Sequence, residues 1–146
     1  MFMHMEIKQL KVVTPEVLSA FEKLIPQLSE KSPILTFEDL AEIINSGNTL
    51  IFVAEENGKI IGTLTLIRYR IPTGKKTWIE DVVVDKSMRG KGIGKMLTQF
   101  VIDWAKKNDI DKIDLTSSPF RIEANELYRK IGFLKRETNV YRLEVL

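Results

Sequence analysis

The sequence has no cysteine and a single histidine among its 146 residues. Without thiolates it can form no disulfide, cysteine nucleophile, zinc–thiolate site or iron–sulfur cluster. One imidazole also argues strongly against a two-histidine metal site or a histidine relay. We therefore predict a chemistry that uses no metal.

Long apolar segments are also missing. No run approaches the roughly 18 apolar residues that a membrane-spanning helix requires. The first residues, Met1–Met5, lack the charged and apolar regions of a signal peptide. These absences predict a cytoplasmic protein with no membrane partner.

Neither sign of charge dominates, since 22 basic and 20 acidic residues give a net charge of +2. Residues 1–74 hold 7 basic and 9 acidic groups, and residues 75–146 hold 15 and 11. This mild asymmetry does not indicate a nucleic-acid partner, but it favours the second half for any anionic ligand. Length and an apolar content of 44% fit one globular domain over residues 1–146.

Apolar periodicity, caps and turn residues predict the order β-α-α-β-β-β-α-β-α-β. Thr14-Pro15 and Thr36 are typical helix starts, and Asn57-Gly58 is typical of a tight hairpin turn. Three consecutive strands should be antiparallel, and the strand–helix–strand unit after them parallel. This is an α/β (α+β) fold with a central mixed sheet flanked by helices. We expect strands at 6–13, 50–54, 60–69, 77–84 and 112–116, helices after 14 and 36 and at 92–107 and 121–131, and one bent or two short strands in 133–145.

A glycine-rich loop between a buried strand and an amphipathic helix carries the most information. It reads Val82-Val83-Val84-Asp85-Lys86-Ser87-Met88-Arg89-Gly90-Lys91-Gly92-Ile93-Gly94-Lys95. Glycines let the backbone approach a ligand closely, and a helix N-terminus carries about half a positive charge. Such a loop binds phosphate groups, and four cations strengthen the pattern.

Two common phosphate loops fit this segment poorly. A nucleotide P-loop needs glycine where Arg89 stands and a hydroxyl where Met96 stands. The dinucleotide motif has the spacing G-x-G-x-x-G, whereas this loop has G-x-G-x-G. A nucleotide-binding protein is therefore the weakest alternative, and a purely structural glycine turn is another.

The run Arg89-Gly90-Lys91-Gly92-Ile93-Gly94 resembles the R/Q-x-x-G-x-G/A loop of the GCN5-related N-acetyltransferase (GNAT) superfamily. The segment Asn125-Glu126-Leu127-Tyr128-Arg129-Lys130-Ile131-Gly132-Phe133 is similar to the N-x-x-x-Y-x-x-x-G-F signature of the same family, with one residue fewer between the asparagine and the tyrosine. The resemblance covers residues 50–146 in element order. It implies the GNAT acyl-CoA N-acyltransferase fold and acetyl-CoA as acyl donor.

The resemblance also implies which residues hold acetyl-CoA. The pantetheine arm would lie between the strands at 77–84 and 112–117 and pair with strand backbone as an added strand would. Asn125 would hydrogen-bond the arm, unless it is simply an exposed helical residue. The implied cofactor-binding residues are Val82, Val83, Val84, Arg89, Gly90, Lys91, Gly92, Ile93, Gly94, Lys95 and Asn125.

Catalysis requires a base, because an alkyl amine is mostly protonated at neutral pH. Strand alternation sends Glu80 and Asp81 to opposite faces. We favour Glu80 as the base, because it resembles the strand acid of several family members. It would accept the proton directly or through water. The alternative is that Glu80 only pairs with a lysine. Asp81 could instead orient the substrate or cap a loop.

Tyr128 matches the family tyrosine whose hydroxyl lies near the sulfur of the donor. A phenol with a pKa of about 10 stays protonated at pH 7 and can serve as general acid for the leaving thiolate. The alternative is that its ring packs in the core and its hydroxyl lies at the surface.

The acceptor is an amine of a small molecule or a peptide. The loop flanked by Arg68-Tyr69-Arg70 and Lys75-Lys76 could shape its site and bind an anionic group on it, or be a solvated hairpin. We expect Glu80, Asp81 and Tyr69 near the substrate. Since a fold does not fix activity, a catalytically silent acyl-CoA-binding module stays open. A homodimer also stays open, because unpaired edge strands favour a partner.

Overall fold

The computed structural model describes residues 4–146. The chain forms two compact units, Met1–Thr116 and Ser117–Leu146, and each is described by itself. The expectation about a signal peptide concerns Met1–Met5, of which Met1–Met3 lie outside the described residues.

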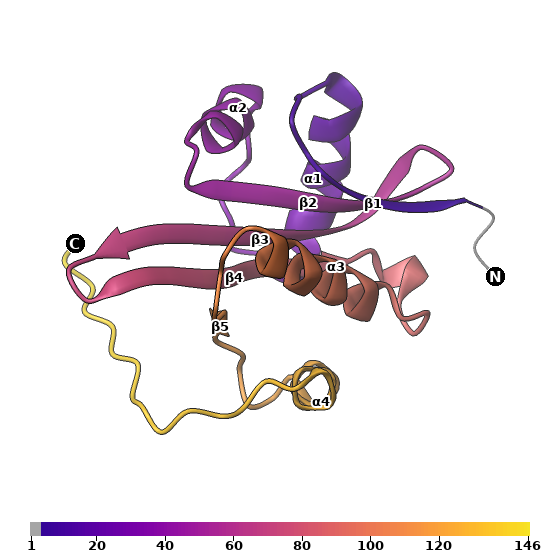
Figure 1. Cartoon of the computed structure of the whole chain (residues 1–146). Helices are drawn as coiled ribbons and strands as arrows, with labels where there is room; N and C mark the ends of the chain where they lie inside the picture. The colour runs from indigo at the N-terminus through magenta and orange to yellow at the C-terminus, as the bar shows by residue number, and fades with distance from the viewer. Residues whose placement is uncertain (1–3) are drawn as a thin grey trace. The chain divides into compact units, whose positions relative to one another are not determined.

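Most of the secondary structure belongs to the first unit (Figure 1). Its elements are β1 (Met5–Gln9), α1 (Pro15–Leu28), α2 (Phe37–Asn45), β2 (Thr49–Glu56), β3 (Lys59–Ile71), β4 (Gly74–Val84), the 3₁₀ turn η1 (Lys86–Met88), α3 (Ile93–Lys107) and β5 (Asp114–Leu115). The second unit contains α4 (Ile122–Ile131). The first nine predicted strands and helices therefore occur in the predicted order.

The strands form one five-stranded mixed sheet in the order β1-β2-β3-β4-β5. Neighbours are antiparallel from β1 to β4, whereas β5 lies parallel to β4. The antiparallel trio and the parallel unit around α3 were both expected from the sequence, and both are confirmed.

Helices cover the two faces of this sheet (Figure 1). On one face, Ile51 and Val53 of β2 pack in a buried cluster with residues of α1 and α2, among them Phe21, Leu24 and Leu40. Phe52 points to the other face, because side chains alternate along a strand. There it meets the rings of Phe100 and Trp104 from α3, with centroids 5.9 and 5.6 Å away.

Local caps explain where α1 and α2 begin. Thr14 accepts a hydrogen bond from Val17 N at 3.2 Å, and Pro15 occupies the first turn, where a missing N–H has no cost. Thr36 and Asp39 form a reciprocal capping box at the start of α2. These caps fix where the chain enters the helices that cover the sheet.

Three strand predictions need correction. The first strand ends at Gln9 rather than Val13, and β5 spans two residues rather than 112–116. The strands expected in 133–145 do not form, and Leu134, Val140 and Tyr141 are 88%, 77% and 87% exposed. Branched and aromatic residues favour a strand only when they pack in a sheet, and this segment joins no ladder among the described residues.

Candidate active site

A β-bulge in β4 sets the direction of the candidate acid. Asp81 has a φ of 48°, and the register against β3 shifts between Thr63 and Thr65. Such a bulge inserts an extra residue and breaks the regular alternation of side chains. The extra residue lies between Glu80 and Val83, so regular alternation does not extend through this stretch, and the placement of Glu80 and Asp81 on opposite faces stays a prediction.

The register shows which face Glu80 takes. Residues opposite each other in an antiparallel ladder share a face. Glu80 lies opposite Thr65, which lies opposite Ile51, so Glu80 is on the sheet face that α1 and α2 cover. Val83 pairs with Thr63 and shares that face. Without the bulge, residues 80 and 83 would lie on opposite faces.

One side of β4 is left without a strand partner. β5 pairs with β4 only at Trp78 and Ile79, so among residues 4–146 no strand adjoins the stretch from Glu80 to Val84 on that side. Asp85 N donates to Ile61 O on β3 at 2.8 Å. Since alternate residues direct their backbone groups to opposite neighbours, those of Val82 and Val84 point to the open side.

The glycine loop follows directly. Gly90 and Gly92 have φ values of 79° and 81°, in the left-handed region that favours glycine. A Cβ at either position would meet nothing within 4 Å, so the loop surface is open there. The first-turn N–H groups of a helix have no intrahelical acceptors, and because Gly92 caps α3 without a side-chain hydrogen bond, those of α3 have no side-chain cap either. These donors suit a diphosphate.

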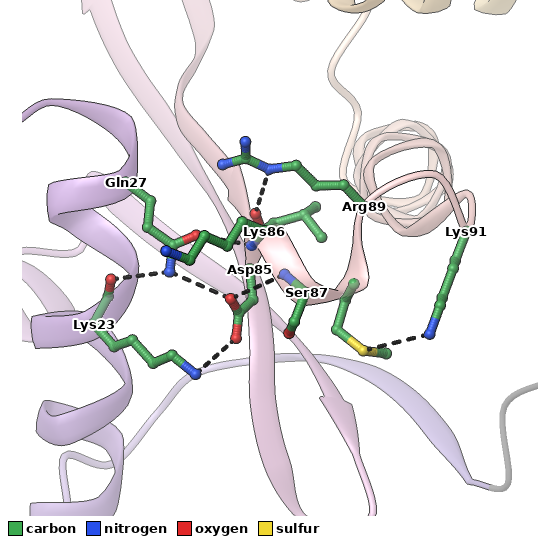
Figure 2. A network of polar contacts seen from close by, with 9 residues as sticks. Lys23, Gln27, Asp85, Lys86, Ser87, Arg89 and Lys91 are labelled. Carbon is green, nitrogen blue, oxygen red and sulfur yellow. Dashed lines mark hydrogen bonds and ion pairs between the residues drawn. The ribbon is translucent and has the colours of Figure 1, made fainter.

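Exposed cations surround these donors: Lys86, Arg89, Lys91 and Lys95. Two of them make contacts within the loop (Figure 2). Arg89 Nε donates to Val84 O at 3.1 Å, and Lys91 Nζ lies 3.8 Å from Met88 Sδ. The Val84 carbonyl thus already has a donor, and the free backbone groups on the open side belong to Val82 and the Val84 N–H.

Glu80 is exposed as a residue, yet partial desolvation of its carboxyl raises its pKa, and the charge of Asp81 raises that pKa further. No ion pair between Glu80 and a lysine occurs in the described part of the chain. The structure therefore does not show the lysine-paired alternative. A carboxylate with a raised pKa is a better proton acceptor at neutral pH.

In the second unit, Tyr128 is 7% exposed, and its ring packs edge-on against Phe133 with centroids 5.7 Å apart. Burial raises the pKa of Tyr128, and the Arg121 charge opposes this shift. The phenol therefore stays neutral at pH 7 and can donate. Asn125 Nδ2 donates to Ser118 O at 3.0 Å, which fixes the start of α4 and leaves the amide oxygen of Asn125 as an acceptor.

Tyr69 lies near the end of the β3–β4 hairpin, opposite Lys76, and is 41% exposed. Arg68, beside it, stacks over the Trp104 ring at 5.6 Å. The hairpin thus presents cations and one phenol to solvent. This arrangement is compatible both with binding an anionic group of the acceptor and with a hairpin that is simply solvated.

A cavity of about 910 Å³ lies elsewhere in the first unit. Parts of β1, α1 and the β2–β3 turn line it, with Asp85 among its lining residues, but Glu80 and residues 89–95 do not. In residues 4–146 no cluster of three or more acidic or histidine side chains could hold a metal ion. No helix of that part of the chain is long and apolar enough to cross a bilayer.

Sequence reasoning missed the contacts of Lys23 and Gln27 on α1. Lys23 Nζ lies 3.0 Å from Asp85 Oδ2, and Gln27 Oε1 accepts from Lys86 N at 2.8 Å. Their spacing of four residues places both on one helix face, which is visible in the sequence. Their partners lie 58 or more residues further along the chain, so the sequence gives no sign of the pairing.

Known proteins share this architecture. The chain matches the Acetyltransferase (GNAT) family over residues 17–133, most of its length. Fold and match together define an acetyltransferase. The chain belongs to the GNAT family, as the two sequence motifs predict.

Individual relatives agree with this assignment. The chain is 31% identical over 137 residues to a glucosamine 6-phosphate N-acetyltransferase of Trypanosoma brucei brucei, covering 88% of this chain and 90% of that protein. It is 31% identical over 113 residues to the uncharacterized N-acetyltransferase YhdJ of Bacillus subtilis, covering 75% of this chain and 80% of that protein. The crystal structure of a Trypanosoma brucei acetyltransferase superposes with a TM-score of 0.78 at 29% identity, covering 97% and 100%.

Proposed function

We propose that this acetyltransferase transfers the acetyl group of acetyl-CoA to a primary amine by direct attack. The observation that carries the proposal is the loop after β4. Two left-handed glycines leave its surface open, α3 begins without a side-chain cap, and exposed cations surround the turn. A diphosphate group fits this set of donors and charges.

The chain also offers a place for the arm of the donor. The N–H and C=O of Val82 and the N–H of Val84 lie on the side of β4 that β5 leaves open. An extended amide-containing arm would pair there as an additional strand pairs with a sheet edge. Asn125 would supply its amide oxygen. Acetyl-CoA supplies the thioester, the activated form of the acyl group.

Glu80 acts as the general base in this proposal. It accepts a proton from the ammonium of the acceptor, directly or through water, and so frees the nitrogen lone pair. A C–N bond then forms as the C–S bond breaks. Tyr128 donates its hydroxyl proton to the sulfur, so that free CoA leaves as a thiol. The nitrogen still carries one proton too many after the attack, and it passes this proton through solvent to the Tyr128 phenolate, which leaves a neutral amide and restores the phenol. Asp81 raises the pKa of Glu80 and adds negative charge that attracts a cationic amine.

The acceptor is proposed to be a small-molecule amine. The T. brucei brucei relative is named for an amino sugar phosphate, glucosamine 6-phosphate. Cations on the β3–β4 hairpin, Arg68, Arg70, Lys75 and Lys76, would suit an anionic group on such an acceptor, with Tyr69 beside it.

Release of free thiol from acetyl-CoA tests the proposal. The panel of acceptors should include glucosamine 6-phosphate, glucosamine, a polyamine, an aminoglycoside and a lysine peptide. Calorimetry with acetyl-CoA runs in parallel. Turnover with at least one amine supports the enzyme. Binding of acetyl-CoA without turnover by any of them would favour the silent acyl-CoA-binding module, and absence of both would overturn the assignment of the loop.

A further inference from the structure

The carboxylate that precedes the glycine loop is buried and fully engaged. Asp85 is 4% exposed and lies between β4 and η1. Lys23 Nζ lies 3.0 Å from its Oδ2, while Gln27 Nε2 and Ser87 N donate to its Oδ1 at 3.4 Å (Figure 2). A charged group this buried is stable only when it is paired and hydrogen-bonded, and Asp85 meets both conditions.

Gln27 contacts the loop at a second point. Its Oε1 accepts from Lys86 N at 2.8 Å, and its Nε2 also donates to Lys23 O at 3.2 Å. Both ends of the amide are therefore occupied, which fixes its orientation. One turn of α1 thus holds a side chain and a backbone N–H of two consecutive residues, Asp85 and Lys86 (Figure 2).

The helix that makes these contacts is itself firmly held. Phe21 and Leu24 of α1 are 3% and 1% exposed and belong to the buried cluster on the sheet. The Asp85 backbone N–H is meanwhile bonded to β3. The segment that enters the loop is therefore fixed from α1 and from the sheet together.

Beyond Met88 the loop is held by contacts of exposed side chains, from Arg89 Nε to Val84 O and from Lys91 Nζ to Met88 Sδ. Gly90 and Gly92 carry no side chain, Gly92 makes no side-chain cap, and the cations are exposed. Glycine has more backbone freedom to lose than any other residue, so ordering this loop on a ligand costs free energy. A fixed entry point reduces that cost before the ligand arrives.

We propose that Lys23, Gln27 and Asp85, here named the α1 clasp, are positioning residues that preorganise the glycine loop for the diphosphate of acetyl-CoA. The proposal rests on the proposed function, which assigns that ligand to the loop. The clasp touches neither the acyl group nor the acceptor. Its loss weakens acetyl-CoA binding, and leaves turnover at saturating acetyl-CoA nearly intact.

The test compares two lysine ion pairs of similar geometry. Lys23→Met breaks the clasp, whereas Lys8→Met breaks the pair of Lys8 with Glu55 at 3.2 Å, between β1 and β2. Both lysines are about half exposed, at 54% and 45%. Gln27→Met is a second clasp variant that keeps the side-chain volume, and Lys23→Arg keeps the charge.

Calorimetry with CoA and steady-state kinetics with one accepted amine are measured for all four variants. We expect Lys23→Met and Gln27→Met to raise the Kd for CoA and the KM for acetyl-CoA about tenfold. Their kcat and acceptor KM should stay within about twofold. Lys8→Met should match the wild type, and Lys23→Arg should recover most of the binding.

Three results would overturn the clasp. The first is an unchanged Kd in both clasp variants, and the second is an equal rise in Lys8→Met, which would indicate general destabilisation. The third is a fall in kcat without a change in Kd. Failure of the wild type itself to bind CoA would instead reject the proposed function, so the two failures are distinguishable. Thermal unfolding of each variant confirms that the protein compared is folded.

Discussion

Glu80 owes its proposed role to its immediate surroundings. Its carboxyl is partly desolvated, and the neighbouring Asp81 charge adds to the effect, so that its pKa lies above the ordinary value. The bulge at Asp81 determines the sheet face on which this carboxyl lies. Both effects arise within two consecutive residues, and substitutions can separate them.

Replacing Glu80 with glutamine removes the proton acceptor and keeps the shape. We expect Glu80→Gln to lower kcat/KM about a hundredfold, in line with the loss of a general base. In the wild type, kcat/KM should fall as pH drops through the raised pKa of Glu80, and the variant should lose that dependence. Asp81→Asn should move the fall to lower pH, because the Asp81 charge raises the Glu80 pKa. A pH profile of kcat/KM measures all three.

The acceptor amine has a pKa several units above that of the Glu80 carboxyl. Its protonation therefore contributes equally to the pH dependence of kcat/KM in every variant of the enzyme. An acid limb that survives in Glu80→Gln in addition to the limb of the amine would exclude Glu80 as the base.

Tyr128→Phe removes one oxygen and keeps the ring that packs against Phe133. If the hydroxyl protonates the leaving thiolate, kcat should fall about tenfold or more while the KM for acetyl-CoA changes little. Tyr141→Phe is the matched control, because that tyrosine is 87% exposed in the C-terminal segment. An unchanged kcat in Tyr128→Phe would leave this tyrosine with a packing role alone.

At the scale of the elements, local sequence signals and distant contacts differ in what they reveal. The starts of α1 and α2 could be predicted, because Thr14 and Thr36 act on N–H groups three residues away. The glycine loop could also be predicted, because its glycines and cations lie within one short stretch of the sequence. The bulge at Asp81 and the clasp could not, since one is an unusual backbone conformation at a non-glycine residue and the other joins residues more than 50 positions apart. The strands expected in 133–145 fail because propensity needs a partner strand.

The turn before α3 depends on the backbone freedom of glycine, which a matched pair of variants can measure. Gly92 and Gly58 have φ values of 81° and 80°, and a Cβ at either would meet open space. Alanine at either site should cost about 1–2 kcal/mol of stability from the left-handed conformation alone. Only Gly92→Ala should also weaken CoA binding, about tenfold, because its methyl enters the loop surface. Equal CoA affinities for the two variants in calorimetry would contradict a ligand at this turn.

At the scale of the whole molecule, folding depends on carboxylates that the native structure favours in charged form. Lys23, with Ser87 and Gln27, holds the pKa of Asp85 below its ordinary value despite burial. The backbone and hydroxyl of Thr36 lower the pKa of Asp39 in the capping box. Glu80 has the opposite shift, so its protonation in acid is easier in the folded chain than in the unfolded one.

These directions give the sign of the acid dependence. A carboxyl with a lowered folded pKa contributes stability above its unfolded value of about 3.9, and this contribution is lost as pH falls through the folded pKa. Urea unfolding between pH 7 and pH 2.5 should therefore show stability falling below about pH 4. Lys23→Met removes the ion-pair partner of Asp85 and should flatten this fall, whereas Lys8→Met leaves Asp85 with its partners and should keep the wild-type slope. If both variants follow the wild type throughout, Asp85 carries no acid-sensitive stability, and the clasp does not hold its carboxyl in charged form.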